Sequence, residues 1–231
     1  MLQYLQHIDE QLTLMFNGST SLFLDRLAVF ATSTWTWMPV ALVLLCVVLK
    51  NNSRRNVFTI LLFIALCILL ADQVASGICK PYFERLRPAR ELDLLHHIDI
   101  VNGYRGGMYG FFSSHAANTF AVATFVSLLI RSRGLTFLLY SWALLNCWTR
   151  LYLGVHYIGD ILIGVLWGFL VGISLFVVWR RWVCDNIASS SNDRTGMITL
   201  GGYQTNDIMY LNMTILLTYA IIIILSFIPW F

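Results

Sequence analysis

Long apolar runs alternate with short polar connections along this chain. Six of the runs approach the roughly 20 residues that a helix needs to cross a bilayer. They cover residues 27–49, 57–75, 114–130, 135–153, 161–179 and 213–230. The pattern predicts an all-α integral membrane protein whose fold is a bundle of six transmembrane helices.

Two segments depart from this pattern. The first, LQYLQHIDEQLTLMF, has apolar residues at helical spacing with polar residues between them, which predicts an N-terminal amphipathic helix lying at the membrane interface. Residues 183–212 are polar and rich in Ser, Asn and Gly, which predicts a loop. The expected organisation is a bundle with its interfacial helix over residues 1–182, a polar cytoplasmic linker over 183–212, and an additional C-terminal transmembrane helix over 213–231.

The amino-acid composition is that of a protein embedded in a membrane. Of the 231 residues, 58% are hydrophobic and 12% are charged, and the mean hydropathy is +0.71. Soluble domains carry roughly a quarter charged residues. The net charge of +3 is small, and no nucleic-acid partner is expected.

The cysteines and the first residues exclude two further classes of protein. The five cysteines have no CxxC spacing and three of them fall in apolar runs, so we interpret them as packing residues. Neither a disulfide framework nor a zinc site is expected. Because no basic segment precedes a short apolar core at the N-terminus, no cleaved signal peptide is expected either.

Charged residues between the runs predict the orientation. Short basic clusters without acidic residues follow the first, third and fifth runs: Lys50, Arg54 and Arg55, then Arg131 and Arg133, then Arg180 and Arg181. The positive-inside rule places such clusters in the cytoplasm. Residues 80–113, residues 150–160 and both termini then face the periplasm of a bacterial inner membrane.

Three polar groups adjoin helix ends on this outward side. They are KPYFERLRP (80–88), FSSHAANTF (112–120) and TRLYLGVHYIGD (149–160). Together they contain the cations Lys80, Arg87 and Arg150, the histidines His115 and His156, and the carboxylate of Asp160. Three cations in one small volume repel each other unless an anion neutralises them, and such clusters usually clamp phosphoryl oxygens. The groups therefore predict a phosphate site.

The spacing within these groups suggests catalysis as well as binding. His156 and Asp160 are four residues apart, so on a helical turn they share one face. The carboxylate can then accept the Nδ1 proton and leave Nε2 as a nucleophile or base. His115 can donate a proton to a leaving group. Ser113 and Ser114 add hydroxyl and N–H groups at a helix N-terminus, which suits an anion.

Other interpretations stay open for single residues. A lone His or Arg at a helix end often extends to the interface or makes an ordinary polar contact. We prefer this interpretation, a solvated loop or a lipid-headgroup contact, for Arg85, Arg90, His96, His97 and Arg105. Asp72 fits a functional charge and a helix-end interaction with a neighbouring arginine about equally well. A metal site at His115, His156 and Asp160 is disfavoured because the three cations would repel a divalent ion.

The same residues resemble a known family. The chain is similar to the type 2 phosphatidic acid phosphatase superfamily, whose signature is Lys-x6-Arg-Pro, then Pro-Ser-Gly-His, then Ser-Arg-x5-His-x3-Asp. The first part stands at residues 80–88 and the third at 149–160, both with the family's spacing. Thr149 replaces the serine, and Phe112 and Ser114 replace the proline and the glycine of the second part. The resemblance covers roughly residues 22–178.

The resemblance implies a role for each site residue. His156 would attack phosphorus and form a phosphohistidine, Asp160 would orient it, and His115 would protonate the departing oxygen. The implied phosphate-binding residues are Lys80, Arg87, Ser113, Ser114 and Arg150. The resemblance implies no metal and no other cofactor.

The expected function is that of a membrane lipid phosphatase at the periplasmic face, with a lipid phosphate and membrane lipids as partners. Undecaprenyl diphosphate and lipid A phosphate are favoured, ahead of phosphatidylglycerophosphate and phosphatidic acid. Residues 94–112 are long enough for a lid or a headgroup-selecting surface; a packed loop with turns at Gly103, Gly106 and Gly107 is the equal alternative. A lipid phosphotransferase and a non-catalytic phospholipid-binding or transport protein also stay open. The sequence does not indicate an oligomeric state.

Overall fold

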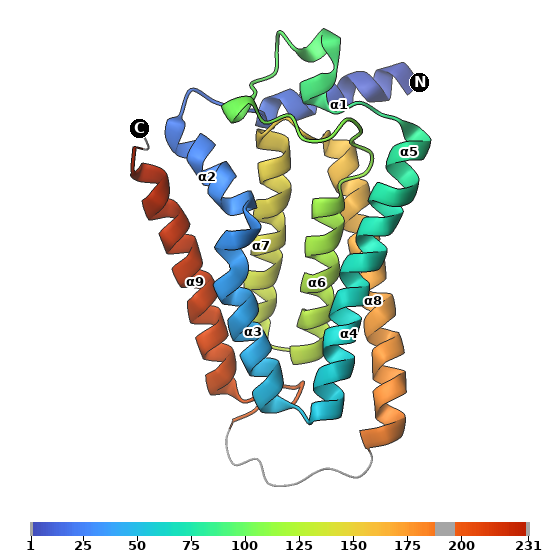
Figure 1. The fold of residues 1–231 in the computed structure, drawn as a ribbon, viewed down its shortest axis with the longest axis vertical. Helices are drawn as coiled ribbons and strands as arrows, with labels where there is room; N and C mark the ends of the chain where they lie inside the picture. The colour runs from blue at the N-terminus through green and yellow to red at the C-terminus, as the bar shows by residue number, and fades with distance from the viewer. Residues whose placement is uncertain (1, 188–196, 230–231) are drawn as a thin grey trace.

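The computed structural model of the protein describes residues 2–187 and 197–229. Long helices run side by side in a bundle, and α1 lies across one end of it (Figure 1). The helices are α1 (Leu2–Phe16), α2 (Leu22–Thr32), α3 (Met38–Asn51), α4 (Arg54–Asp72), α5 (Lys80–Phe83), α6 (Ser114–Ile130), α7 (Arg133–Tyr152), α8 (Ile158–Ile187) and α9 (Thr205–Phe227). The described residues form no β-sheet, so the all-α prediction is confirmed.

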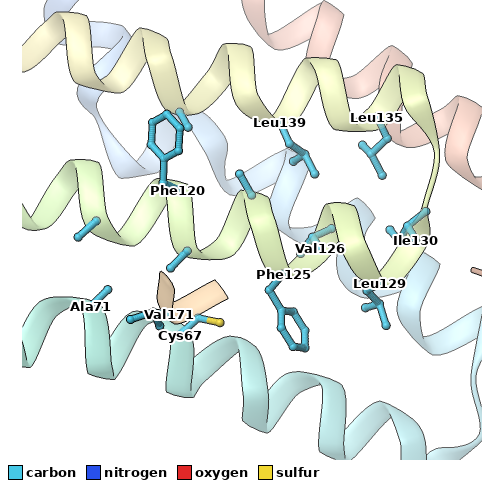
Figure 2. Close-up of a cluster of buried hydrophobic side chains, with 14 of the residues drawn as sticks. Cys67, Ala71, Phe120, Phe125, Val126, Leu129, Ile130, Leu135, Leu139 and Val171 are labelled. Atoms are coloured by element: carbon cyan, nitrogen blue, oxygen red, sulfur yellow. The ribbon is translucent and has the colours of Figure 1, made fainter. Parts of the chain in front are cut away.

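The central helix is α6, which is apolar on all sides. A helix without a polar face is stable only where other helices surround it. Most of α6 is buried, and it packs against α4, α7 and α8. Figure 2 shows its side chains Phe120, Phe125 and Leu129 within the cluster that α4 and α7 complete. The first turn of α6 therefore has a fixed position in the bundle.

Three glycines on α8, spaced four residues apart, allow that helix to approach α6 closely. A Cβ atom at Gly164, Gly168 or Gly172 would lie within 2.7 Å of a backbone carbonyl of α6. Small residues at this spacing are a common means of bringing membrane helices into backbone contact. Because Gly164 faces the carbonyl of Ser113, the N-terminus of α6 lies beside the first turns of α8.

Four helical stretches are long and apolar enough to cross a membrane: Thr34–Asn51, Arg54–Phe83, Ile158–Trp182 and Thr205–Phe227. The apolar helix α6 is shorter, and α7 falls outside this set because polar residues such as Asn146 and Arg150 interrupt it. The described residues thus contain four candidate spans of a multi-pass membrane protein, where the apolar pattern predicts six.

The first two apolar runs differ in detail from the prediction. Run 27–49 is not one helix, because α2 ends at Thr32 and a 3₁₀ turn, Thr34–Trp37, leads into α3 with Pro39 in its first turn. The second run is longer than predicted. After α4 the chain continues through a π-helical turn, Gln73–Cys79, directly into α5, so Lys80 lies on a helix and not in a loop.

The predicted loop over 183–212 is helical at both of its ends, which corrects that interpretation. Helix α8 continues to Ile187, and α9 begins at Thr205. The first turn of α9 is polar because it bonds to α3: Lys50 Nζ donates to Asp207 Oδ1 at 2.6 Å, and Asn51 Nδ2 donates to Asp207 Oδ2 at 2.8 Å. Residues 188–196 of this linker lie outside the described residues.

Helix α1 is attached to the start of α8. Asp9 Oδ1 accepts a hydrogen bond from the backbone N–H of Gly159 at 2.8 Å, and Thr13 Oγ1 accepts one from Ile158 at 3.1 Å. The first four N–H groups of a helix lack partners within it, and side-chain oxygens commonly supply them. Helix α1 therefore supports the same turn of α8 that contains Asp160.

Candidate active site

The polar groups singled out in the sequence meet at the end of the bundle that α1 crosses (Figure 1). His115 lies within electrostatic range of Lys80, Arg87, Arg150 and His156. These side chains come from α5, the segment after it, α6, the last turn of α7 and the turn before α8. The structure therefore brings together all of the ionisable groups predicted for the site.

His156 and Asp160 form a buried pair. His156 Nδ1 lies 3.4 Å from Asp160 Oδ2, and the two side chains are 1% and 0% exposed. The same carboxylate oxygen accepts a hydrogen bond from the backbone N–H of Tyr157 at 3.2 Å. A Cβ atom at Gly110 would lie 3.0 Å from this oxygen, so the chain covers the pair closely at this glycine. With Nδ1 facing the carboxylate, Nε2 is the nitrogen left to react.

The surroundings of His156 keep its imidazole neutral. Burial lowers the pKa of His156 to about 4, although the hydrogen bond with Asp160 acts in the opposite direction. The positive charges of Arg87 and Arg150 act in the same direction as burial and contribute to this value. An attacking nitrogen must be unprotonated, and a histidine whose pKa lies below the ordinary value of about 6.5 is unprotonated at neutral pH. The site thus contains a neutral imidazole, which is the state that a nucleophilic histidine requires.

Arg85 is part of the site, and its interpretation as a solvated loop residue was wrong. Its Nη1 donates to Asp160 Oδ1 at 3.0 Å and its Nη2 donates to Asp9 Oδ2 at 2.7 Å. Its guanidinium carbon lies 3.9 Å from the centre of the Tyr157 ring. Burial lowers the pKa of Arg85, but the carboxylates of Asp160 and Asp9 outweigh it and the net shift is upward. Arg85 therefore holds the carboxylate that faces His156.

Arg150 is a buried cation without an acidic partner. Its side chain is among the largest that are fully buried, and the residue is 2% exposed. Nε donates to Thr149 Oγ1 at 3.3 Å and Nη2 donates to Thr32 Oγ1. Within the described residues, no carboxylate lies at ion-pair distance from it. A buried charge is costly unless it is paired, so the arrangement indicates that an anion completes the site.

Lys80 and Arg87 are likewise oriented by neutral groups. Lys80 Nζ donates to the hydroxyls of Ser76 and Ser114, at 2.9 and 3.1 Å. Arg87 donates to two backbone carbonyls, from Nε to Tyr109 at 3.1 Å and from Nη1 to Val155 at 3.3 Å. Hydroxyls and carbonyls direct a cation without cancelling its charge. Together with Arg150, these side chains form a cluster of three positive charges without an ion-pair partner among the described residues, which we call the cation cluster.

The first turn of α6 places its three polar residues differently. Ser113 is fully buried and caps the helix, accepting a bond from the N–H of Ala116 at 3.4 Å, while its own N–H donates to the carbonyl of Asp160 at 3.1 Å. Ser114 is half-buried, and its hydroxyl faces Lys80. His115 is exposed. Ser113 therefore joins α6 to α8, whereas Ser114 and His115 face the open side of the cluster.

Asp72 is linked to Lys80 of the site, which favours the first of its two alternative interpretations, a functional charge. Its Oδ1 accepts a bond from Ser76 Oγ at 3.1 Å, and Ser76 accepts one from Lys80. The three residues are spaced four apart along one helical face. Asp72 thus helps to orient the ammonium group of Lys80 without forming an ion pair with it.

Residues 104–110 pack against residues 85–90. Leu86 and Tyr109 form an isolated antiparallel bridge, and Arg90 Nη2 donates to the carbonyl of Gly106 at 2.8 Å. Gly103 and Gly106 have φ values of 71° and 60°, so turns occur at these two glycines, but Gly107 has no positive φ. In the structure this part of the chain is a packed loop, one of the two alternatives given for residues 94–112. Movement of the loop as a lid stays a prediction. His96, His97 and Arg105 are exposed, as expected.

The described part of the chain contains no group of side chains suited to a metal ion and no disulfide bond. No cluster of three or more His, Cys, Asp or Glu side chains there could hold a metal ion. The four cysteines whose side chains are described, Cys46, Cys67, Cys79 and Cys147, are free.

Comparisons with known proteins identify the family of the chain. The sequence profile of the PAP2 superfamily matches residues 56–184. The chain is 41% identical over 169 residues to a Lipid A 4'-phosphatase from Bacteroides thetaiotaomicron, covering 73% of this chain and 75% of that protein. It is 31% identical over 186 residues to a Lipid A 4'-phosphatase from Porphyromonas gingivalis, covering 79% of each.

Solved structures share the fold. The crystal structure of Aquifex aeolicus LpxE aligns with a TM-score of 0.55 at 25% identity, covering 72% of this chain and 93% of that one. A transmembrane PAP2 type phosphatidylglycerolphosphate phosphatase from Bacillus subtilis aligns with a TM-score of 0.59 at 18% identity, covering 81% and 90%. At that identity the second match shows the fold alone.

The profile match contains every ionisable residue of the site except Asp9, and it spans all three polar motifs. The relatives are named as phosphatases, and the matches cover at least 73% of this chain and 75% of theirs. The structure places a neutral histidine beside the cation cluster. The protein is thus a membrane phosphatase, and its chain belongs to the PAP2 superfamily.

Proposed function

We propose that this protein removes the 4'-phosphate of lipid A through a phosphohistidine at His156. The observation that carries the proposal is the buried His156–Asp160 pair next to three cations that have no carboxylate partner among the described residues. A phosphate monoester carries about −1.5 to −2 charges at neutral pH, which neutralises most of the cluster. Both curated relatives are Lipid A 4'-phosphatases, which favours this substrate over undecaprenyl diphosphate.

The mechanism follows from the placement of each group. Nε2 of His156 attacks phosphorus. His115 takes up a proton when the phosphate dianion enters the cation cluster, and it gives this proton to the sugar oxygen as the bond from phosphorus to that oxygen breaks. Asp160 stabilises the positive charge that forms on His156. The cation cluster binds the remaining phosphoryl oxygens as their charge develops. In the second step the neutral His115 accepts a proton from water as the water attacks the phosphohistidine, which releases inorganic phosphate and regenerates the imidazole of His156.

The membrane position follows from the charges at the two ends of the bundle. Helices α6 and α7 run alongside the four candidate spans (Figure 1), so they cross the membrane with them and complete six crossings. The basic clusters around Arg54, Arg131 and Arg180 lie at the end opposite the site. By the positive-inside rule that end is cytoplasmic. The site then opens to the periplasm of a bacterial inner membrane, with α1 at its interface.

A panel of lipid phosphates tests the substrate. The purified full-length protein is incubated in detergent micelles with lipid A bisphosphate, undecaprenyl diphosphate, phosphatidylglycerophosphate or phosphatidic acid, with and without EDTA. We expect inorganic phosphate to be released fastest from lipid A, with mass spectrometry locating the loss at the 4' position and EDTA having no effect. Faster release from another lipid would reassign the substrate; no release from any of them would contradict the phosphatase mechanism.

Arg85→Gln tests the support of Asp160. We expect kcat to fall about 10²-fold with a small change in KM, because a misplaced catalytic group costs roughly that much and Arg85 reaches the reaction only through Asp160. Steady-state kinetics on lipid A provide the measurement. Arg90→Gln is the matched control, since Arg90 bonds to the loop carbonyls of Gly106 and Gly107 and should lose little activity. A rise in KM alone would instead show that Arg85 binds the substrate.

A further inference from the structure

Asp9 of helix α1 reaches the candidate active site from outside the three motifs. Helix α1 lies across the end of the bundle that contains the site (Figure 1), and Asp9 precedes the residues that the PAP2 profile matches. Both oxygens of its carboxylate are bonded: Oδ1 accepts from the N–H of Gly159 at 2.8 Å, and Oδ2 accepts from Arg85 Nη2 at 2.7 Å. These two bonds, to different segments of the chain, fix the position of the carboxylate.

The two partners of Asp9 both adjoin Asp160. Gly159 precedes Asp160 in the first turn of α8, and Arg85 Nη1 donates to Asp160 Oδ1 at 3.0 Å. The other carboxylate oxygen of Asp160 lies 3.4 Å from His156 Nδ1. An unbroken series of polar contacts therefore leads from α1 to His156.

The space around the Asp9 carboxylate is narrow and mostly withdrawn from water. A Cβ atom at Gly159 would lie 2.9 Å from Asp9 Oδ2. The side chains of Asp9 and Arg85 are 17% and 27% exposed, and that of Asp160 is 0% exposed. Charges in such surroundings interact more strongly than charges at an open surface, because water screens them less. The carboxylate of Asp9 therefore acts on Arg85 and Asp160 through its charge as well as through its bonds.

The sum of these charges matters for the reaction at His156. One guanidinium stands between two carboxylates, so one positive and two negative charges leave a net charge of −1. An ion pair of Arg85 with Asp160 alone would carry no net charge. The imidazole of His156 becomes positive when Nε2 attacks phosphorus, and a fixed negative charge beside it stabilises that state. Asp9 supplies the carboxylate that makes the group negative.

We propose that Asp9 is a positioning residue of the phosphatase reaction. It holds Arg85 against Asp160 and offsets the charge of the guanidinium, so that Asp160 keeps its negative charge toward His156. This inference rests on the proposed function, because it assigns Asp9 a part in the attack by His156. Helix α1 then belongs to the catalytic apparatus and is more than an attachment at the membrane interface.

Asp9→Asn in the full-length protein tests this role. The amide oxygen can still accept the N–H of Gly159, but the negative charge beside Arg85 is lost. Steady-state phosphate release is measured in detergent micelles with whichever lipid phosphate the wild type hydrolyses fastest, at equal amounts of folded protein. We expect kcat to fall about tenfold and KM to stay within about twofold, since the lost interaction acts on the transition state and not on substrate binding.

Two control variants separate this effect from net charge and from the attachment of α1. Glu10→Gln removes the same charge from the same helix, and the ion-pair contact of Glu10 is with His7. Thr13→Ala removes the bond from the N–H of Ile158, which also attaches α1 to α8. We expect both variants to keep kcat within about twofold of the wild type, although Thr13→Ala should lower the unfolding temperature.

A double-variant cycle shows whether Asp9 acts through Arg85. Effects of residues that share one interaction do not add. We therefore expect Asp9→Asn combined with Arg85→Gln to have the kcat of Arg85→Gln alone, within about twofold. Multiplied losses would mean that Asp9 acts independently of Arg85 and would overturn the proposal.

The remaining outcomes also decide the proposal. A loss of kcat in Asp9→Asn, with both controls close to the wild type, supports it. An active wild type with an unaffected Asp9→Asn, or an equal loss in Thr13→Ala, overturns it and leaves the proposed function intact. A wild type that releases phosphate from no lipid would overturn the proposed function and this inference together.

Discussion

Replacing His156 with alanine is expected to reduce phosphate release from lipid A by at least about 10³-fold, the scale of loss seen when an enzyme nucleophile is removed. Among the residues that the structure describes, only His156 has a site nitrogen that is both buried beside a carboxylate and kept neutral by its surroundings. No neighbouring side chain in that region has the same arrangement. Release of inorganic phosphate by purified wild type and variant, at equal amounts of folded protein, is the measurement.

The covalent intermediate provides a second readout of the same prediction. A phosphohistidine is acid-labile and stable to base, so brief incubation with radiolabelled substrate followed by alkaline quenching should label the wild-type chain. His156→Ala should carry no label. His97→Ala is the control, because His97 is exposed in the loop at the same end of the bundle. Labelling that persists in His156→Ala would place the nucleophile elsewhere and overturn the mechanism.

The motif residues were predictable because their spacing carries information on geometry. His156 and Asp160 stand four apart, and their side chains meet, although His156 lies in the bend before α8 and only Asp160 is in the first turn of that helix. The topology that the charge clusters predict also brings Lys80, His115 and Arg150 to one end of the bundle. Whether that end is periplasmic stays a prediction, since charge alone supports it.

Arg85 and Asp9 could not be assigned from the sequence because each takes its role from a distant partner. Arg85 bonds to residues 75 and 76 positions away in the chain, Asp160 and Asp9. The residues around Arg85 in the sequence are those of an ordinary charged loop and do not indicate its partners. Asp9 lies on a helix whose apolar spacing suggested only the membrane interface, yet it also holds the N–H of Gly159. Contacts of this kind become visible only when the helices are assembled.

The glycines of α8 did carry a signal that the interpretation by apolar runs overlooked. Gly164, Gly168 and Gly172 repeat every four residues, which is the spacing of a close helix–helix contact. A search for apolar runs counts glycine only as a neutral residue. In the structure this spacing seats α8 on α6 and places Ser113 beside Asp160, so the second and third motifs meet because of residues outside both.

Replacing Arg150 with methionine is expected to reduce activity about 10²- to 10³-fold, the loss typical of removing one donor from a transition-state charge. It should also stabilise the protein without substrate, since exchanging a buried ion for an apolar side chain of similar size often adds about 1–4 kcal/mol. Arg150 is 2% exposed and bonds only to hydroxyl oxygens in the hydrogen bonds described for it, so no ion pair in the described part of the chain offsets its charge.

Anion-dependent unfolding separates this role from a structural one. Orthovanadate or phosphate should raise the unfolding temperature of the wild type, because either anion would neutralise the cation cluster, and should raise that of Arg150→Met much less. Arg150→Lys should recover part of the stabilisation but little activity, since an ammonium group cannot reproduce the planar fork of a guanidinium. Arg105→Met, which removes an exposed guanidinium from the nearby loop, is the control. A less stable Arg150→Met that still responds fully to vanadate would mean that Arg150 holds α7 to α2 through Thr32 and does not bind phosphate.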